Sequence, residues 1–253
     1  MQFQFAPCGI AVNIADQADL LASVAQRFAA RQGFALATIN LDHLVKLQSS
    51  ESFRAAYREQ DMVVADGHPI VWLSRLAKHP VSLVPGSDLV LPLAQAAARA
   101  KVSVALVGST DAALQAAEAH LRRAVPGLNV VLRHAPAMGF DPQGEEAACV
   151  LAELAARNVG LCFVALGAPK QETFAARGRK LAPQVGFASI GAGLDFLAGT
   201  QMRAPAWVRT LAMEWAWRAL TNPRRLIPRY AACVAILPSQ IAAALEQRHT
   251  PNI

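Results

Sequence analysis

The stretch VSVALVGSTDAALQAAEAHLRRA, residues 102–124, contains the pattern that decides the fold. It begins with an apolar run rich in valine, passes through the small-residue turn Gly108-Ser109-Thr110, and continues as an amphipathic segment. A short β-branched run favours a buried strand, whereas apolar residues that recur every three to four positions favour a helix. The stretch therefore predicts a strand over 102–107 and a helix over 110–124.

The same alternation of strand and helix recurs along most of the chain. Strands are predicted at 34–39, 62–65, 102–107, 128–133, 160–166 and 185–190. Helices are predicted near 17–32, 42–59, 68–77, 87–100, 110–124, 143–157 and 169–181. This order is typical of an α/β fold with a Rossmann-like, mostly parallel sheet and helices on both faces. The first residues, QFQFAPCGIAV, suggest an added hairpin or edge strand.

Length and composition limit the class of protein. With 253 residues, 54% of them apolar and 17% charged, the chain suits one large α/β domain with a small appendage. It has no uninterrupted apolar run of about 18 residues, so no membrane span is predicted. Its start lacks the regions of a signal peptide, which makes the cytoplasm the expected compartment. The four cysteines form no CxxC pair, so neither a zinc site nor a disulfide framework is expected.

The end of the chain is basic. Residues 203–253 hold seven arginines and two glutamates, so they carry +5 of the net charge of +6. Asn222-Pro223 is placed to begin a helix, and Pro228 and Pro238 are expected to break it into short pieces. The expected domains are 1–202, an α/β unit, and 203–253, a basic helical appendage. Charge alone leaves nucleic acid, anionic lipid and a phosphorylated substrate as alternative partners.

Polar residues follow the first two predicted strands, at the edge where such sheets bind ligands. Thr38 and Asn40 could cap the next helix, or they could hydrogen-bond a sugar or a phosphate. Asp66, followed by Gly67, could accept a proton from a substrate hydroxyl, or it could cap the helix that follows.

Two further loops have residues that suit a helix N-terminus. In Pro85-Gly86-Ser87-Asp88, the serine and the aspartate can cap an amphipathic helix whose amides could face an anion. Gly108 ends a predicted strand in a turn that resembles nucleotide-binding turns, although one glycine does not make a fingerprint.

The most unusual loop is Gly167-Ala168-Pro169-Lys170-Gln171-Glu172. Gly167 ends an apolar strand, and Pro169 opens a helix whose first turn holds the three residues that follow. A lysine there opposes the helix dipole, so Lys170 is either a plain surface residue or a ligand of a phosphate.

The remaining candidates concern a nucleotide diphosphate. Gly191-Ala192-Gly193-Leu194-Asp195-Phe196 has phenylalanine where a dinucleotide fingerprint needs its third glycine, which argues against a dehydrogenase. No DxD pair and no metal-ligand spacing occurs, so neither a metal nor another cofactor is expected. Cations and helix N-termini would then hold a diphosphate. The candidate arginines are Arg203, Arg218, Arg224 and Arg225. The tryptophans interleaved with them are also typical of a membrane interface.

Taken in order, these loops resemble the WecG/TagA/CpsF family, glycosyltransferase family 26. The resemblance runs from about residue 8 to residue 230. Its motifs are T-x-N at 38–40, D-G at 66–67, G-S-D-L at 86–89, G-x-P-K-Q-E at 167–172, G-x-G-x-x-F at 191–196, R-A-P at 203–205, E-W at 214–215, Arg218 and P-R-R at 223–225.

The resemblance implies an inverting, metal-independent transfer of a hexose from a UDP-sugar to an undecaprenyl-diphosphate-linked sugar. It implies a peripheral enzyme on the inner face of the cytoplasmic membrane that builds cell-surface polysaccharide, with no nucleic acid as partner. Homo-oligomers are possible. The hexose could be N-acetylmannosamine, its uronic acid or glucose.

The resemblance also implies residue roles. Asp66 matches the catalytic base, and the residues that match the donor pocket are Thr38, Asn40 and Gln171. The C-terminal helices would cover the site and touch the membrane. The arginines that would hold a diphosphate are Arg218, Arg224 and Arg225.

Two departures from the family pattern and two alternative functions remain. Leu83 stands where the family often has arginine, and residues 134–140 differ from an expected G-Y-F. The alternatives are a nucleotide-dependent oxidoreductase and a non-enzymatic module that binds membrane or nucleic acid.

Overall fold

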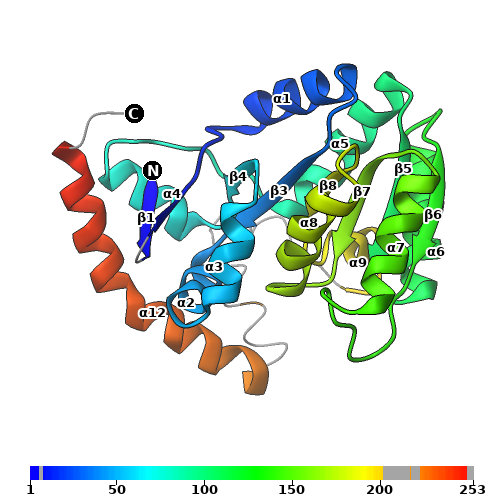
Figure 1. Ribbon diagram of the computed structural model, residues 1–253. Coiled ribbons are helices and arrows are strands. Elements are labelled where there is room, and N and C mark those ends of the chain that lie inside the picture. Colours follow the sequence, from blue (N-terminus) through cyan, green and yellow to red (C-terminus); the bar gives the residue numbers. More distant parts are fainter. Residues whose placement is uncertain (6–7, 202–216, 218–222, 250–253) are drawn as a thin grey trace.

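The structure is a computed structural model that describes residues 1–5, 8–201, 217 and 223–249. Six parallel strands form one sheet in the order β4-β3-β8-β7-β5-β6 (Figure 1). They are β3 (Phe34–Ile39), β4 (Met62–Ala65), β5 (Ser103–Gly108), β6 (Val130–His134), β7 (Val159–Ala165) and β8 (Gly186–Ser189). The six predicted strands and the α/β, Rossmann-like class are confirmed.

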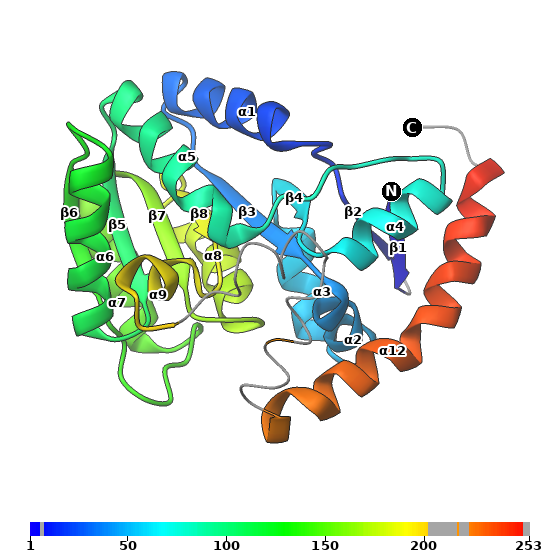
Figure 2. The same cartoon turned by 180° about the vertical axis from the view of Figure 1, so that it is seen from behind.

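Helices cover both faces of this sheet (Figures 1 and 2). One face packs against α1 (Gln17–Ala29), α5 (Gly86–Ala100), α6 (Asp111–Ala124) and α9 (Gly193–Ala198). The other face packs against α2 (Leu41–Ser49), α3 (Glu51–Arg58), α7 (Glu145–Ala156) and α8 (Lys170–Leu181). The sequence did not predict α9, because so short a helix shows no clear period.

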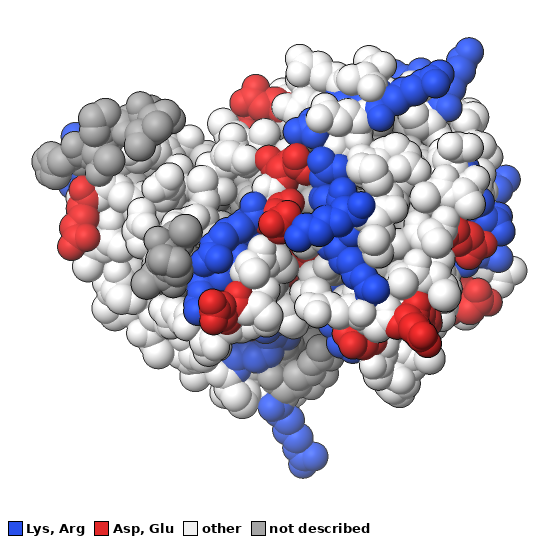
Figure 3. Space-filling model, viewed as in Figure 1, with Lys and Arg blue, Asp and Glu red and all other residues white. Residues whose placement is uncertain are grey.

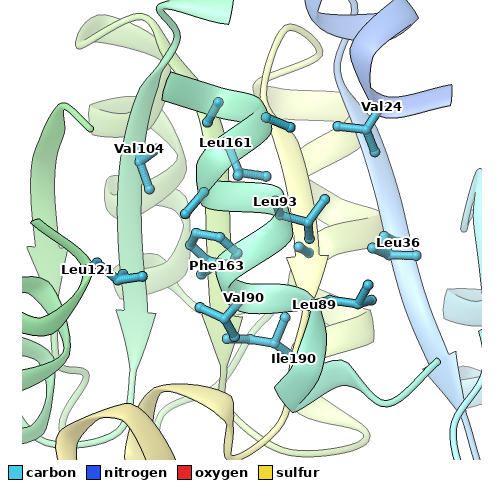
Figure 4. Packing of buried hydrophobic residues seen from close by; sticks show 14 of the residues in the cluster. Val24, Leu36, Leu89, Val90, Leu93, Val104, Leu121, Leu161, Phe163 and Ile190 are labelled. Carbon is cyan, nitrogen blue, oxygen red and sulfur yellow. The ribbon is translucent and has the colours of Figure 1, made fainter. Parts of the chain in front are cut away.

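Strand β3, which lies between the edge strand β4 and β8, contributes to a core on each face. Leu36 belongs to the same core as Leu89 and Leu93 of α5 (Figure 4), whereas Ala37 and Ile39 lie in the core under α2 and α3. Complete burial of one such leucine stabilises a fold by roughly 1.5–3 kcal/mol. The two cores therefore make the sheet a rigid support for the loops at its carboxyl edge.

The predicted helix at 42–59 is in fact two helices, α2 and α3, which meet at Ser50. The backbone of Ser50 is extended, and its Oγ accepts a hydrogen bond from the amide of Phe53 (3.2 Å). A serine in this conformation caps the second helix and thereby ends the first.

The first residues form the expected hairpin, a separate antiparallel sheet of β1 (Gln2–Phe5) and β2 (Cys8–Ala11). Its Phe3 and Ile10 share a core with α4 (His68–Leu76). The long helix α12 (Pro223–Glu246) packs along α2 and α4 in both views, and a short 3-10 turn (Gln247–His249) follows it. Nε2 of Gln247 donates to the carbonyl oxygen of Gln2 (2.6 Å), so the first strand lies beside the last helix.

One sequence prediction about α12 needs correction. The helix continues through Pro228 and Pro238 instead of breaking there. Each proline removes one backbone hydrogen bond, but burial of Cys233 and Ala244 against the body of the protein offsets that loss. By length and composition alone, the 21 residues Leu226–Glu246 would suffice to cross a membrane, so the predicted absence of a span stays a prediction.

Candidate active site

The loops after β3 and β4 bring Asn40 and Asp66 together at the carboxyl edge of the sheet. The two strands pair up to Ile39 and Ala65, and the amide of Asp66 donates to the carbonyl of Ile39 (2.8 Å). A Cβ atom built on Gly67 would lie 3.8 Å from the Cβ of Asn40. Both Asn40 and Asp66 are half-buried, so they line the edge where a doubly wound sheet binds ligands.

Helix capping explains Asn40 but not Asp66. Oδ1 of Asn40 accepts a hydrogen bond from the amide of His43 (3.1 Å), which confirms the capping prediction for this residue. At α4 the N-cap position belongs to Gly67, whose φ of 111° lies in the region that favours glycine. Asp66 is therefore not the N-cap of α4, and its role as a proton acceptor stays a prediction.

The N-terminus of α5 packs directly onto the ends of β3 and β8. A Cβ atom on Gly86 would lie 3.2 Å from the Cα of Ile190 and 3.2 Å from Oγ1 of Thr38, which is buried. This close approach leaves little room for a side chain at position 86, which explains why glycine occupies it. Asp88 lies half-buried in the first turn, and the N-cap position belongs to Pro85 rather than to Ser87 or Asp88.

The turn after β5 is joined to α9. Gly108 has a φ of 118°, and a Cβ atom there would lie 2.3 Å from the carbonyl oxygen of Ala165, so only glycine fits. The next residue, Ser109, also has a positive φ, and its Oγ donates to Oδ1 of Asp195. Sequence reasoning singled out Gly108 and Asp195, but it had no signal for the serine that connects their loops.

Gln171 and Glu172 are buried, with 2% and 0% of their surfaces exposed. Oε1 of Gln171 accepts a hydrogen bond from the amide of Gly191 (3.2 Å), and its Nε2 donates to Oε1 of Glu172 (2.8 Å). One side chain thus ties the β7–α8 loop to the β8–α9 loop. Gln171 is therefore placed to hold the two loops in position from inside the protein.

A buried polar cluster surrounds Glu172. Burial raises the pKa of Glu172 to about 7, and its Oε2 has no hydrogen-bond partner among the described residues. Burial also raises the pKa of Tyr57, with a further contribution from the charge of Glu172. The hydroxyl of Tyr57 lies 2.6 Å from Nδ1 of His43, and burial lowers the pKa of His43 to about 3. Tyr57 and His43 are therefore neutral near pH 7, where Glu172 titrates.

The rest of the β7–α8 loop faces solvent. Gly167 and Pro169 are exposed, and Lys170 is half-buried in the first turn of α8, as the sequence predicts. Nζ of Lys46 in α2 donates to the carbonyl oxygen of Ala168 (3.1 Å). Sequence reasoning missed Lys46, because its partner lies far away along the chain.

The predicted arginines are placed only in part. Arg203 and Arg218 lie outside the described residues, and so does the side chain of Arg225. Arg224 is exposed in the first turn of α12. Their contact with a diphosphate stays a prediction, and so does the effect of Leu83, which is exposed in the segment that leads into α5.

Several charges elsewhere on the body form ion pairs. Figure 3 shows lysine and arginine interleaved with aspartate and glutamate over the face formed by α3 and α8. Asp61 there binds Arg27 (3.3 Å) and Arg179 (2.8 Å). Across the described parts of the chain, no three His, Cys, Asp or Glu side chains gather as a metal-ligand group.

These features define a class of protein: a doubly wound α/β fold whose polar loops follow the carboxyl ends of its parallel strands. The chain leaves β3 for α2 on one face and β8 for α9 on the other, and such a divergence opens a ligand site.

The chain belongs to the Glycosyl transferase WecG/TagA/CpsF family, whose sequence profile matches residues 5–252. It is similar to two N-acetylglucosaminyldiphosphoundecaprenol N-acetyl-beta-D-mannosaminyltransferases. The one from Bacillus spizizenii is 28% identical over 210 residues, and the one from Bacillus subtilis is 26% identical over 209 residues. Each alignment covers 80% of this chain and 79% of the relative. The chain is therefore a glycosyltransferase, which selects one of the functions that the sequence left open.

Proposed function

We propose that this glycosyltransferase moves N-acetylmannosamine from its UDP-sugar to N-acetylglucosamine on undecaprenyl diphosphate, with inversion and without a metal ion. The observation that carries the proposal is the family match over residues 5–252, which includes every loop at the carboxyl edge of the sheet. The names of the two relatives supply the acceptor and the transferred group. The uronic acid of N-acetylmannosamine and glucose are the alternative hexoses.

In this proposal Asp66 is the catalytic base. The acceptor hydroxyl attacks the anomeric carbon from the side opposite the UDP group, which inverts that carbon. As the new bond forms and the bond to UDP breaks, the proton of the hydroxyl passes to the carboxylate of Asp66. Asn40 and Thr38, at the end of the neighbouring strand, would hold the donor sugar. General-base catalysis of this kind contributes about 10²–10⁴-fold to rate.

The leaving UDP gains negative charge in the transition state, so fixed donors and cations near its diphosphate help most. The loops Gly167–Glu172 and Gly191–Asp195 would shape the nucleotide pocket. The amides at the start of α8 and the ammonium of Lys170 would meet the diphosphate from the body. The arginines that would complete the site from the appendage are Arg203, Arg218, Arg224 and Arg225.

The appendage, residues 203–253 in our proposed division, would bring the site to the lipid. The exposed apolar side chains of α12 are Ile227, Val234, Ile241 and Leu245. Their spacing of seven, seven and four residues places them on one exposed face of the helix, about 100° around from the buried Cys233 and Ala244. Because α12 is docked on the body while this stripe faces outward, we propose that it lies on the inner face of the cytoplasmic membrane.

The test is transfer of labelled sugar from a UDP-hexose to a short-chain lipid diphosphate that carries N-acetylglucosamine, with UDP-N-acetylglucosamine as control donor. We expect product only with the correct donor, an unchanged rate in EDTA, and an inverted anomeric centre by NMR. A rate abolished by EDTA and restored by magnesium would refute metal independence. No transfer from any of the three named donors would refute the proposed reaction.

A further inference from the structure

Three charged side chains connect α12 to the β7–α8 loop. Arg229 of α12 forms a forked ion pair with Asp42 of α2, with Nε 3.1 Å from Oδ1 and Nη2 2.6 Å from Oδ2. Nζ of Lys46, one turn further along α2, lies 2.8 Å from the same Oδ2 and 3.1 Å from the carbonyl oxygen of Ala168. The contacts therefore run without a gap from α12 to the loop that contains the G-x-P-K-Q-E motif.

The pair between Arg229 and Asp42 is stronger than an ordinary surface contact. Burial alone would raise the pKa of Asp42, but hydrogen bonds from Arg229 and Lys46 outweigh it and lower that pKa to about 2. The side chain of Asp42 is only 19% exposed, so solvent screens the pair less than it screens exposed charges. The planar guanidinium also matches both carboxylate oxygens, which fixes the orientation of α12 on α2.

Asp42 has one negative charge and binds two cations. While Arg229 shares the carboxylate, Lys46 is also able to donate to the neutral carbonyl of Ala168. If Arg229 moves away, the whole charge of Asp42 attracts Lys46. A hydrogen bond to a charged acceptor is stronger than one to a neutral carbonyl. The lysine would then favour Asp42, and the loop would lose its contact.

We propose that Asp42 and Lys46 are positioning residues that couple docking of α12 to the conformation of the β7–α8 loop, and through this loop to donor affinity. Neither residue touches the reacting atoms. The part about affinity rests on the proposed function, in which this loop shapes the nucleotide pocket. The coupling means that the loop is in place for the donor when the appendage is docked.

Hydrogen exchange of the full chain without substrate tests the coupling directly. In Arg229→Met we expect amides of both 224–236 and 166–172 to exchange on the order of 10-fold faster than in the wild type. In Lys46→Met we expect faster exchange of 166–172 only, because Arg229 and Asp42 still pair. Unchanged exchange of 166–172 in Arg229→Met would overturn the coupling. So would a Lys46→Met variant that loosens α12 as much as the loop.

Glu118→Gln is the matched control. The carboxylate of Glu118 also binds two cations, Arg122 and Arg133, and is 15% exposed, but it lies at the far edge of the sheet. We expect this variant to leave exchange at 166–172 unchanged. Faster exchange there would mean that loss of any such ion pair loosens the loop, and the specific coupling would be wrong.

Kinetics then test the consequence for the donor. We expect Arg229→Met and Lys46→Met to raise KM for the UDP-sugar on the order of 10-fold while kcat changes little, and Arg229→Lys to restore part of the affinity. Coupled exchange with an unchanged KM would overturn the link to the donor. A wild-type chain without transferase activity would refute the proposed function instead, and the exchange result would stand independently.

Discussion

Gln171 and Gly191 join two loops of the candidate site through one hydrogen bond, from the amide of Gly191 to Oε1 of Gln171 (3.2 Å). Their strands are neighbours in the sheet, but the loops turn toward opposite faces. The same amide side chain holds Oε1 of the buried Glu172 (2.8 Å). A change at Gln171 is therefore expected to affect both loops at once.

We predict that Gln171→Ala lowers the free energy of unfolding by about 1–3 kcal/mol, because it removes the partner of a part-buried amide and of a buried carboxyl oxygen. It should also raise KM for the donor. Urea titration and initial rates measure the two effects. Gln184→Ala is the control, since the side chain of Gln184 donates a long 3.5 Å hydrogen bond to the carbonyl oxygen of Ala155, away from the site. Equal stability of the two variants would contradict this account of Gln171.

We predict that Asp66→Asn retains the fold but loses on the order of 10²–10⁴ in kcat, because an amide cannot accept the proton of the acceptor. Donor affinity should change little. The comparison is Asp19→Asn, which alters an exposed carboxylate on α1. Single-turnover transfer with saturating donor gives the measurement, and full activity of Asp66→Asn would eliminate this residue as the base.

We predict a pH-dependent stability that Glu172→Gln removes. The folded-state pKa of Glu172 is about 7, above the ordinary 4.5, so the protonated form is favoured by folding. Its stabilising contribution is fully present below pH 4.5 and is lost as pH rises through 7. Relative to Glu172→Gln, the wild type should therefore lose on the order of 3 kcal/mol between pH 5 and 8. Urea unfolding at both values checks this, and a constant difference would show that Glu172 does not titrate in this range.

The strands, and the sheet edge that carries the candidate site, could be predicted from sequence because both depend on local patterns. Short apolar runs such as β3 and β7 predict buried strands, and glycines followed by polar residues mark the strand ends. The contacts that shape the site are not local. Lys46 and Ala168 are 122 residues apart, and Arg229 and Asp42 are 187 apart, so only the assembled fold brings them together.

The prediction that Pro228 and Pro238 break α12 was wrong because it also relied on a local rule. A proline is unfavourable by a local rule, and packing of α12 on α2 and α4 overrides it. The sequence also predicted Gln171 as a pocket residue, but only the structure shows that its amide points into the protein.

We predict that the double variant Val234→Asp with Ile241→Asp loses binding to vesicles of anionic lipid while retaining UDP binding. Both side chains belong to the exposed apolar stripe of α12, and each charge would have to be desolvated at the bilayer. Leu181→Asp is the control, because Leu181 is 51% exposed at the end of α8 and lies outside the stripe. Sedimentation with vesicles measures the binding. If the double variant binds as well as the wild type, the stripe is not the lipid contact.

The last prediction concerns the turn that carries Ser109. Gly108→Ala should destabilise the fold by about 3 kcal/mol, because the new Cβ would lie 2.3 Å from the carbonyl oxygen of Ala165 and the φ of 118° suits only glycine.

The control variant, Gly127→Ala, tests the backbone strain alone, without the steric collision. Gly127 also has a positive φ, of 84°, but a Cβ atom there meets nothing within 4 Å, so we expect a loss of only about 1 kcal/mol. Chemical denaturation gives both values. A cost for Gly108→Ala no larger than that for Gly127→Ala would mean that β5 and β7 can separate at their ends. The close approach of Gly108 to Ala165 would then not explain why glycine occupies this position.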